Sequence, residues 1–285
     1  MNANDNTVLQ KPDRYAVFGK PVAHSLSPRI HAMFAAQCAA VIDYTRREIE
    51  DGDFEQAVAN FFAAGGAGLN ITQPYKQRAA AMAQQLGTAA TAAGAANTLY
   101  MHNGQLHAEN TDGTGLVRDL QQNLGWSIED ARLLLVGAGG AVRGVLEPLL
   151  ACRPASVTLA NRTAAKAEQL EEIFAETAGA FSVSLQATEL AALQRGYDIV
   201  INGSSAGLSG TIPALDASVV DGARCYDLVY GAGAAPFLQW AAQSGARSLA
   251  DGLGMLVEQA AAAFHIWRGV HPETRTVIEQ LRDAS

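Results

Sequence analysis

Short apolar runs alternate with helical patterns along the first part of the chain. Strands are predicted at residues 15–19, 44–49, 68–72 and 97–101. Helices are predicted at residues 27–38, 54–64 and 76–86. Asn103-Gly104 lies between two short apolar runs, which is typical of a hairpin turn. Such alternation of strands and helices indicates a layered α/β protein with mainly parallel strands.

A second series of the same kind begins after Gly125. Residues 132–136 form a continuous apolar run, as expected for a strand buried on both faces of a sheet. The remaining predicted strands are 156–160, 181–185, 197–201 and 225–229, and the predicted helices are 143–150, 163–176, 253–267 and 272–282. We therefore expect two α/β regions that meet near residues 111–114. The pattern alone leaves open where the last two helices pack.

Composition and charge narrow the class of protein. The chain has 285 residues, of which 49% are apolar and 17% charged, and this is typical of a globular protein. The net charge of −8 argues against a nucleic-acid partner, because an acidic surface repels phosphate backbones. Small anions remain possible ligands, since a few local cations and backbone amides suffice to bind them.

The cysteines and the apolar segments indicate the compartment. Cys38, Cys152 and Cys225 are far apart and form no CxxC pair, so neither a disulfide framework nor a structural zinc site is expected. Residues 1–13 lack the apolar core of a signal peptide, and the apolar stretch at 260–267 is too short to span a bilayer. We expect a cytoplasmic protein without a membrane partner.

A glycine-rich turn follows the buried strand at 132–136 and precedes a helix. It consists of Gly137, Ala138, Gly139, Gly140 and Ala141. Glycines let backbone amides approach a pyrophosphate, and the helix N-terminus adds unpaired N–H groups and a positive dipole end. The match to G-x-G-x-x-G is imperfect because Val142 stands at the third glycine position, so a plain strand–helix turn remains an alternative.

The next strand indicates which dinucleotide would bind. A site for NAD usually places a carboxylate there, which accepts a hydrogen bond from the ribose 2′-hydroxyl. This chain instead has Asn161, Arg162 and Thr163, with Lys166 one turn later. Arg162 and Lys166 could bind a 2′-phosphate, which favours NADP over the alternative that they are ordinary solvated residues.

The first region contains four clusters of polar residues that core packing does not require. They lie at residues 24–28, 70–76, 97–98 and 110–113, mostly where a predicted strand ends. That edge is the usual site location in an open α/β sheet. Each cluster alone has a structural explanation, because Ser27 and Asp112 could merely cap helices and Lys76 could merely be solvated.

Taken in order, the clusters resemble the shikimate dehydrogenase family from about Tyr15 to the final helices. The matching blocks are His24-Ser25-x-Ser27-Pro28, Asn70-x-Thr72-x-Pro74-x-Lys76, Gly94-Ala95-x-Asn97-Thr98, Asn110-Thr111-Asp112-Gly113, Gly137-Ala138-Gly139-Gly140-Ala141, Asn161-Arg162-Thr163 and Asp251-Gly252-Leu253-Gly254-Met255-Leu256-Val257-x-Gln259-Ala260. The resemblance implies reduction of 3-dehydroshikimate to shikimate with NADPH. Thr88 stands where many relatives have an acidic residue, and residues 202–207 are a variant of a cofactor-side loop.

The resemblance also implies a role for each matching residue. Lys76 and Asp112 would be the catalytic pair, and Leu228 and Gly252 would border the nicotinamide. The implied substrate contacts are Ser25, Ser27, Thr72, Asn97, Asp112, Tyr230 and Gln259. A Rossmann-type NADP domain would span residues 112–251, and a discontinuous α/β substrate domain would combine residues 1–111 with residues 252–285.

The chemistry of these side chains agrees with that interpretation. Hydride reduction of a ketone builds negative charge on oxygen, which the Lys76 ammonium could stabilise or protonate. Asp112 could orient Lys76 and bind a substrate hydroxyl, and no metal is required. Two alternatives remain, a quinate/shikimate dehydrogenase that also uses NAD and a non-catalytic NADP-binding sensor. We expect a monomer or a homodimer.

Overall fold

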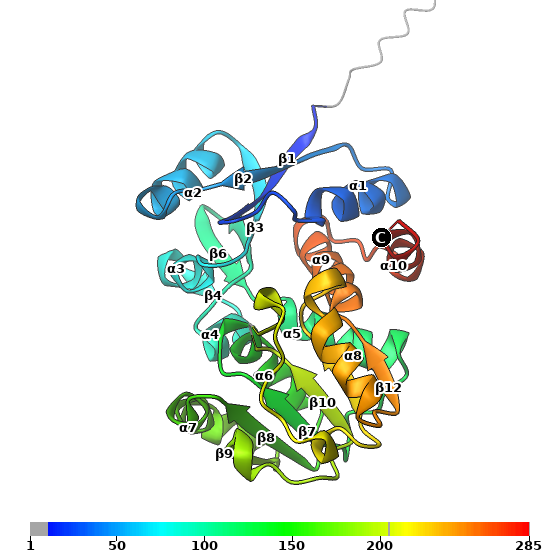
Figure 1. Ribbon diagram of the computed structural model, residues 1–285. Coiled ribbons are helices and arrows are strands. Elements are labelled where there is room, and N and C mark those ends of the chain that lie inside the picture. The colour runs from blue at the N-terminus through cyan, green and yellow to red at the C-terminus, as the bar shows by residue number, and fades with distance from the viewer. Residues whose placement is uncertain (1–10, 205, 285) are drawn as a thin grey trace, which may run out of the picture.

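The computed structural model describes residues 11–204 and 206–284. It has two lobes, each built on a six-stranded sheet, with the first lobe above the second in Figure 1. Residues 1–10 of the expected substrate domain and Ser205 of the expected cofactor-side loop lie outside the described residues. Within the described ranges, no helix is long and apolar enough to cross a membrane.

The first sheet is mixed, with strand order β2-β1-β3-β5-β6-β4. Its strands are β1 (Asp13–Gly19), β2 (Ile42–Glu48), β3 (Gly66–Ile71), β4 (Gln85–Leu86), β5 (Thr98–His102) and β6 (Gln105–Glu109). The strands β1, β2 and β3 are parallel, whereas β5 runs antiparallel to both β3 and β6. The helices of this lobe are α1 (Ser27–Gln37), α2 (Phe54–Ala63), α3 (Lys76–Met82) and α4 (Thr88–Ala93).

The second sheet is entirely parallel, with strand order β12-β11-β10-β7-β8-β9. Its strands are β7 (Arg132–Val136), β8 (Ser156–Asn161), β9 (Ser184–Glu189), β10 (Ile199–Asn202), β11 (Arg224–Asp227) and β12 (Ser248–Ala250). Its helices are α6 (Gly140–Ala151), α7 (Ala164–Ala180) and α8 (Ala235–Gln243). Because β7 has β8 on one side and β10 on the other, the chain reverses direction across the sheet at β7, where ligands bind in such folds.

Two helices pass between the lobes. They are α5 (Asp112–Arg118), which continues as a π-helical turn (Asp119–Asn123), and α9 (Leu253–Arg268), which α10 (Arg275–Arg282) follows. The helix α5 packs against both α9 and α6. Short 3-10 turns occupy Asp51–Asp53, Leu190–Ala192, Ala206–Ser209, Ala217–Val219 and Gly231–Gly233.

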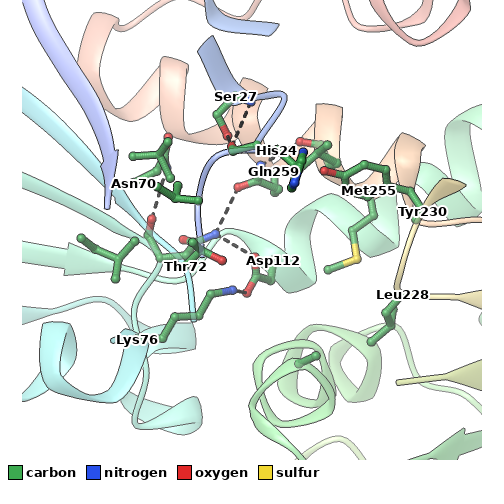
Figure 2. A pocket seen from close by; sticks show the side chains of 18 of the residues that line it. His24, Ser27, Asn70, Thr72, Lys76, Asp112, Leu228, Tyr230, Met255 and Gln259 are labelled. Carbon is green, nitrogen blue, oxygen red and sulfur yellow. Dashed lines mark hydrogen bonds and ion pairs between the residues drawn. The ribbon is translucent and has the colours of Figure 1, made fainter. Parts of the chain in front are cut away.

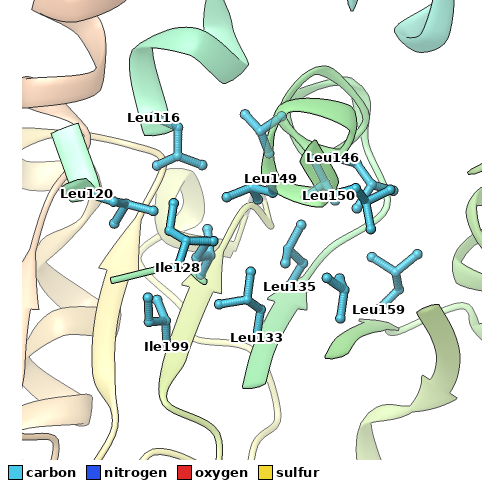
Figure 3. Packing of buried hydrophobic residues seen from close by; sticks show 14 of the residues in the cluster. Leu116, Leu120, Ile128, Leu133, Leu135, Leu146, Leu149, Leu150, Leu159 and Ile199 are labelled. Carbon is cyan, nitrogen blue, oxygen red and sulfur yellow. The ribbon is translucent and has the colours of Figure 1, made fainter. Parts of the chain in front are cut away.

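Apolar clusters fix these arrangements. In the second lobe, leucines and isoleucines of β7, β8 and β10 pack under α5 and α6 (Figure 3). A separate cluster joins the ends of the chain, where Ile30 and Phe34 of α1 contact Val257 and Phe264 of α9. Since α10 adds Val277 to the same cluster, both C-terminal helices pack on the first lobe, beside α1 (Figure 1).

Several boundaries differ from the sequence prediction. The helix predicted to reach residue 86 ends at Met82, because Gln85 and Leu86 pair with β6 instead. The strand predicted at 181–185 lies further along the chain, since α7 extends to Ala180 and β9 spans Ser184–Glu189. The apolar side chain of Phe181 packs on the core from the helix end, so its hydrophobicity did not indicate a strand. The elements α4, α8 and β12 were not predicted.

The crossing of α5 and α9 depends on a glycine, which yields a stability prediction. A Cβ on Gly115 would lie 2.7 Å from the Met255 carbonyl oxygen and 2.8 Å from the Gln259 nitrogen. Gly115→Ala should therefore force the helices apart and lower the free energy of unfolding by about 1–3 kcal/mol. Urea unfolding measures this change.

Gly179→Ala is the matched control, because Gly179 is also helical but a Cβ there would meet nothing within 4 Å. Its stability should stay level or rise by up to about 1 kcal/mol through better helix propensity. Equal midpoints for the two variants would contradict the close crossing.

Candidate active site

The topology of the first sheet brings four polar segments to one edge. The strands β1, β3 and β6 end there, so the segments that begin at His24, Thr72 and Asn110 follow them at that edge. The strand β5 is antiparallel to β3 and therefore begins at the same edge, which places Asn97 among them. Polar groups that are distant in sequence thus face one space.

Lys76 owes its position to the residue before it. The Tyr75 ring is fully buried and stacks on Phe54, with ring centroids 4.6 Å apart. The Tyr75 hydroxyl donates to the Ile49 carbonyl at 2.5 Å. Because Tyr75 is fixed on the core side, Lys76 begins α3 at the rim of the sheet with its ammonium free to reach across the edge (Figure 2).

Lys76 forms a close ion pair with Asp112. The distance from Lys76 Nζ to Asp112 Oδ2 is 2.5 Å, and the Asp112 side chain is only 10% exposed. The Asn97 side-chain amide donates to Asp112 Oδ1 at 2.8 Å and lies 3.2 Å from Gln259 Oε1. Asp112 also lies in the first turn of α5, where a negative charge is favourable. Its carboxylate is therefore held by neighbours on several elements.

A cavity of about 370 Å³ opens above this pair. All the residues expected to contact substrate line it, namely Ser25, Ser27, Thr72, Lys76, Asn97, Asp112, Tyr230 and Gln259. Leu228 and Gly252, expected at the nicotinamide, line the same cavity, and Leu228 approaches it from the second lobe (Figure 2). Burial raises the pKa of the Tyr230 hydroxyl, which keeps that group a neutral donor.

A second cavity of about 490 Å³ lies at the carboxyl edge of the parallel sheet. All the other residues expected to bind the cofactor line it, namely Gly137, Ala138, Gly139, Gly140, Ala141, Asn161, Arg162, Thr163 and Lys166. Ala141 lines both cavities. The geometry brings every predicted site residue into one of two adjoining spaces.

The second cavity fits a phosphorylated dinucleotide. Gly137 has φ +115°, and a Cβ there would lie 2.9 Å from the Gly203 backbone, so the tight turn requires glycine. Cβ atoms on Gly139 and Gly140 would meet nothing within 4 Å, which leaves the N-terminus of α6 open to an anion. Arg162 and Lys166 are exposed and have no ion-pair partner in the described part of the chain.

Comparison with known proteins agrees with this geometry. Three family models match, for a shikimate dehydrogenase substrate binding domain (residues 17–99), a shikimate/quinate 5-dehydrogenase (119–210) and a shikimate 5′-dehydrogenase C-terminal domain (252–282). A shikimate dehydrogenase (NADP(+)) from Alkalilimnicola ehrlichii is 52% identical over 95% of this chain and 98% of its own. The chain belongs to the shikimate dehydrogenase family.

Solved structures extend the likeness to three dimensions. An enzyme from Pseudomonas putida is 45% identical, with a TM-score of 0.89 over 94% of this chain and 98% of its own. A shikimate 5-dehydrogenase from Thermus thermophilus, solved with NADP(H) and shikimate, is 30% identical, with a TM-score of 0.84 over 96% of this chain and all of its own. The expected α/β fold with two lobes is thereby confirmed.

The structure adds residues that the family motifs did not assign. Asn70 is buried at the cavity wall, where its amide donates to Thr98 Oγ1 and its Oδ1 accepts from the Tyr44 hydroxyl. Apolar side chains of Val17 and Met255 complete the first cavity. Residues 211–214 border the second cavity, although their sequence carries no dinucleotide signature. Asn70 could have been found, because it is the first residue of the family motif Asn70-x-Thr72-x-Pro74-x-Lys76.

An aromatic cluster supports the wall behind Asn70. His31 is 1% exposed and stacks on Tyr44, with ring centroids 4.5 Å apart. The buried His31 Nε2 has no hydrogen-bond partner among the described residues. Burial lowers the pKa of His31 from 6.5 to about 3, so the folded protein holds this imidazole neutral.

His31 should therefore make stability depend on pH. An unfolded chain protonates this histidine below pH 6.5, while the folded protein resists protonation down to about pH 3. Titration of this histidine leaves the free energy of unfolding unchanged above pH 6.5. Below pH 6.5 it lowers that free energy, by up to about 1.4 kcal/mol for each pH unit. Urea unfolding between pH 7.5 and 4 should show this decline, and His31→Phe should remove part of it.

The comparison with His31→Phe separates the effect of the histidine from that of groups whose titration changes stability in the opposite direction. Burial raises the pKa of Asp227 to about 6, so that carboxyl favours the folded state as the pH falls. Both proteins share this contribution, and it cancels in their difference. Parallel pH profiles would show that His31 does not titrate differently in the two states.

Proposed function

We propose that this protein catalyses the reversible reduction of 3-dehydroshikimate to shikimate with NADPH, a step that leads to chorismate and the aromatic amino acids. The observation that carries the proposal is the Lys76–Asp112 pair, at 2.5 Å, on the floor of a cavity with hydroxyl and amide groups in its lining, which adjoins the cavity at the glycine turn. The family and the NADP(+)-specific naming of its relatives support the same activity.

Lys76 and Asp112 are assigned the chemical step. NADPH supplies a hydride when bound, and the carbonyl that receives it develops negative charge on oxygen. The Lys76 ammonium stabilises that oxygen and can transfer a proton to it, which completes the alcohol. Asp112 holds Lys76 in place and accepts a hydrogen bond from a substrate hydroxyl. In the reverse direction the neutral lysine accepts the hydroxyl proton.

The remaining polar residues orient the substrate. Ser27 and Tyr230 present hydroxyl groups at the end of the cavity away from Lys76, where they suit a carboxylate (Figure 2). The Ser25 hydroxyl lies beside them, 3.1 Å from Ser27 Oγ. Thr72, Asn97 and Gln259 are assigned to the ring hydroxyls. On these assignments the reacting carbon would lie between Lys76 on one side and Leu228 and Gly252 on the other.

The cofactor residues divide by the part of NADPH that they meet. The glycine turn at 137–141 suits the pyrophosphate, because its amides and the N-terminus of α6 face the second cavity. Arg162 and Lys166 suit the 2′-phosphate, with Asn161 and Thr163 beside it. The Asn161 side chain donates to the Thr163 carbonyl at 3.0 Å, which fixes the turn that carries Arg162.

The chain is divided into domains on the same basis. Residues 1–111 together with 252–285 form the substrate domain, and residues 112–251 form the NADP domain. The cluster that joins α1, α9 and α10 supports the return of the C-terminus to the first lobe. We place the protein in the cytoplasm as a monomer or homodimer, and its three free cysteines suit a reducing compartment.

A matrix of substrates and cofactors tests the proposed function. The kcat/KM value should be highest for shikimate with NADP, lower with NAD because Arg162 and Lys166 lose their phosphate, and lowest for quinate. Equal or better turnover of quinate with NAD would instead identify a dual-specificity quinate/shikimate dehydrogenase. Absence of turnover in any combination, despite NADPH binding, would identify a sensor.

Lys76→Ala tests the catalytic assignment. Loss of the ammonium should lower kcat by about 10²- to 10⁴-fold, because the developing oxyanion loses its proton donor. The dissociation constant for NADPH, measured by fluorescence titration, should hardly change. Lys20→Ala, which removes a lysine outside the lining of both cavities, should retain activity. A Lys76→Ala variant as active as Lys20→Ala would refute the assignment.

A further inference from the structure

Strand β2 presents two arginines that lie next to each other in sequence but on opposite faces of the sheet. Successive side chains of a strand alternate between the two faces. Arg47 lies over the Phe61 ring, with its guanidinium carbon 5.5 Å from the ring centroid. Arg46 lies on the other face with Tyr44, whose hydroxyl donates to the cavity residue Asn70 at 2.7 Å. Of these two arginines, Arg46 is the one on the face of the substrate cavity.

Three observations place Arg46 beside the end of that cavity where Ser25 and Ser27 lie. Its Nε donates to the Ser25 carbonyl oxygen at 2.7 Å. Its partner in the register of β1 is Val17, which lines the cavity. Its positive charge also acts on Tyr230, where it opposes the rise in pKa that burial causes. Arg46 thus lies near both Ser25 of the first lobe and Tyr230 of the second.

The charge of Arg46 is not offset by a neighbour. The ion pairs of the described residues include none that involves Arg46. Among the described residues, the cavity lining contains one lysine, one carboxylate and no arginine, and the lysine and the carboxylate are Lys76 and Asp112, which pair with each other. Apart from the imidazole of His24, the hydroxyl-rich end of this described lining therefore has no basic side chain of its own, in a protein of net charge −8.

We propose that Arg46 supplies the positive charge that attracts and holds the substrate carboxylate at Ser25 and Ser27, and so selects anionic substrates. This inference rests on the proposed function, because it takes shikimate as the ligand of the cavity. Arg46 is a positioning and specificity residue rather than a catalytic one, since it does not line the space where hydride transfer would occur.

The kinetic signature follows from where the charge acts. A cation near the mouth of a cleft raises the encounter rate and affinity of an anion, and salt screens this effect. Loss of Arg46 should raise KM for shikimate and lower kcat/KM, while kcat changes little. The KM for NADP should stay unchanged, because Arg162 and Lys166 serve the other cavity.

The experiment compares wild-type protein, Arg46→Gln, Arg46→Lys and Arg47→Gln. Arg47→Gln is the matched control, because it removes the same charge from the adjacent position on the opposite face. At low ionic strength and saturating NADP, kcat/KM for shikimate should fall by roughly tenfold in Arg46→Gln. It should stay near the wild-type value in Arg47→Gln and recover largely in Arg46→Lys.

The salt dependence separates charge from loop structure. Raising the salt to roughly 0.5 M shortens the Debye length to a few Å, so kcat/KM should decline in the wild type and converge on the Arg46→Gln value. A loss in Arg46→Gln that persists at high salt and in Arg46→Lys would show that Arg46 only supports the Ser25 loop. Equal values for Arg46→Gln and Arg47→Gln would also overturn the proposal.

Failure of the proposed function would be distinct from either result. In that case the wild-type protein itself would not oxidise shikimate, whereas the inference about Arg46 fails only if an active wild type shows no selective dependence on this residue.

Discussion

The two lobes meet at the Asp112 carboxylate, and the arrangement of each lobe depends on it. It pairs with Lys76 from α3 at 2.5 Å and accepts from Asn97 at the start of β5 at 2.8 Å. On its other side lies α6, the helix that begins at the glycine turn, and a Cβ on Gly144 of that helix would lie only 3.5 Å from Asp112 Oδ2. The neighbouring Gly113 is packed more tightly still, since its Cβ would meet Pro148 of α6 at 2.4 Å. A shift of α6 must therefore displace the backbone that carries Asp112. Glycine at both contacts is what lets α5 and α6 pack so closely.

Much of this arrangement could be predicted because parallel strands impose a rule on position. Residues that follow β7 and β8 must lie at the same edge of a parallel sheet, so the glycine turn and Arg162 were expected to meet one ligand. In the same way, the order of the family motifs led us to expect Ser27, Lys76 and Asp112 to meet at the edge of the first sheet. The cluster of α1 and α9 answers a question that the sequence pattern left open, because periodicity shows which face of a helix is apolar but not which partner covers it.

What could not be predicted depends on contacts between distant segments. The strand β4 reads as the end of an alanine-rich helix, and only the free edge of β6 draws Gln85 and Leu86 into the sheet. Asn97 was assigned to the substrate from its motif, but the antiparallel pairing of β5 with β3, which brings Asn97 to this edge, was not predicted. Arg46 lies in a segment with no motif, and its exposed side chain looks like any solvated arginine in the sequence. Its significance appears only when the register of β1 and β2 places it beside Val17.

The polar network around Asn97 explains how so many polar groups can be buried at one edge. An unpaired buried polar group costs about 1–3 kcal/mol, so such a cluster is stable only when its members satisfy one another. Asn97 meets this condition, because its amide nitrogen donates to Asp112 and Thr111 while its oxygen accepts from the Thr111 backbone and the Thr98 hydroxyl. The site is thus preorganised by neutral dipoles, and its one ion pair is internally balanced. Because the Lys76 charge is already paired with Asp112, the proposed role of Arg46 adds a positive charge from outside the network, at the rim where β2 passes.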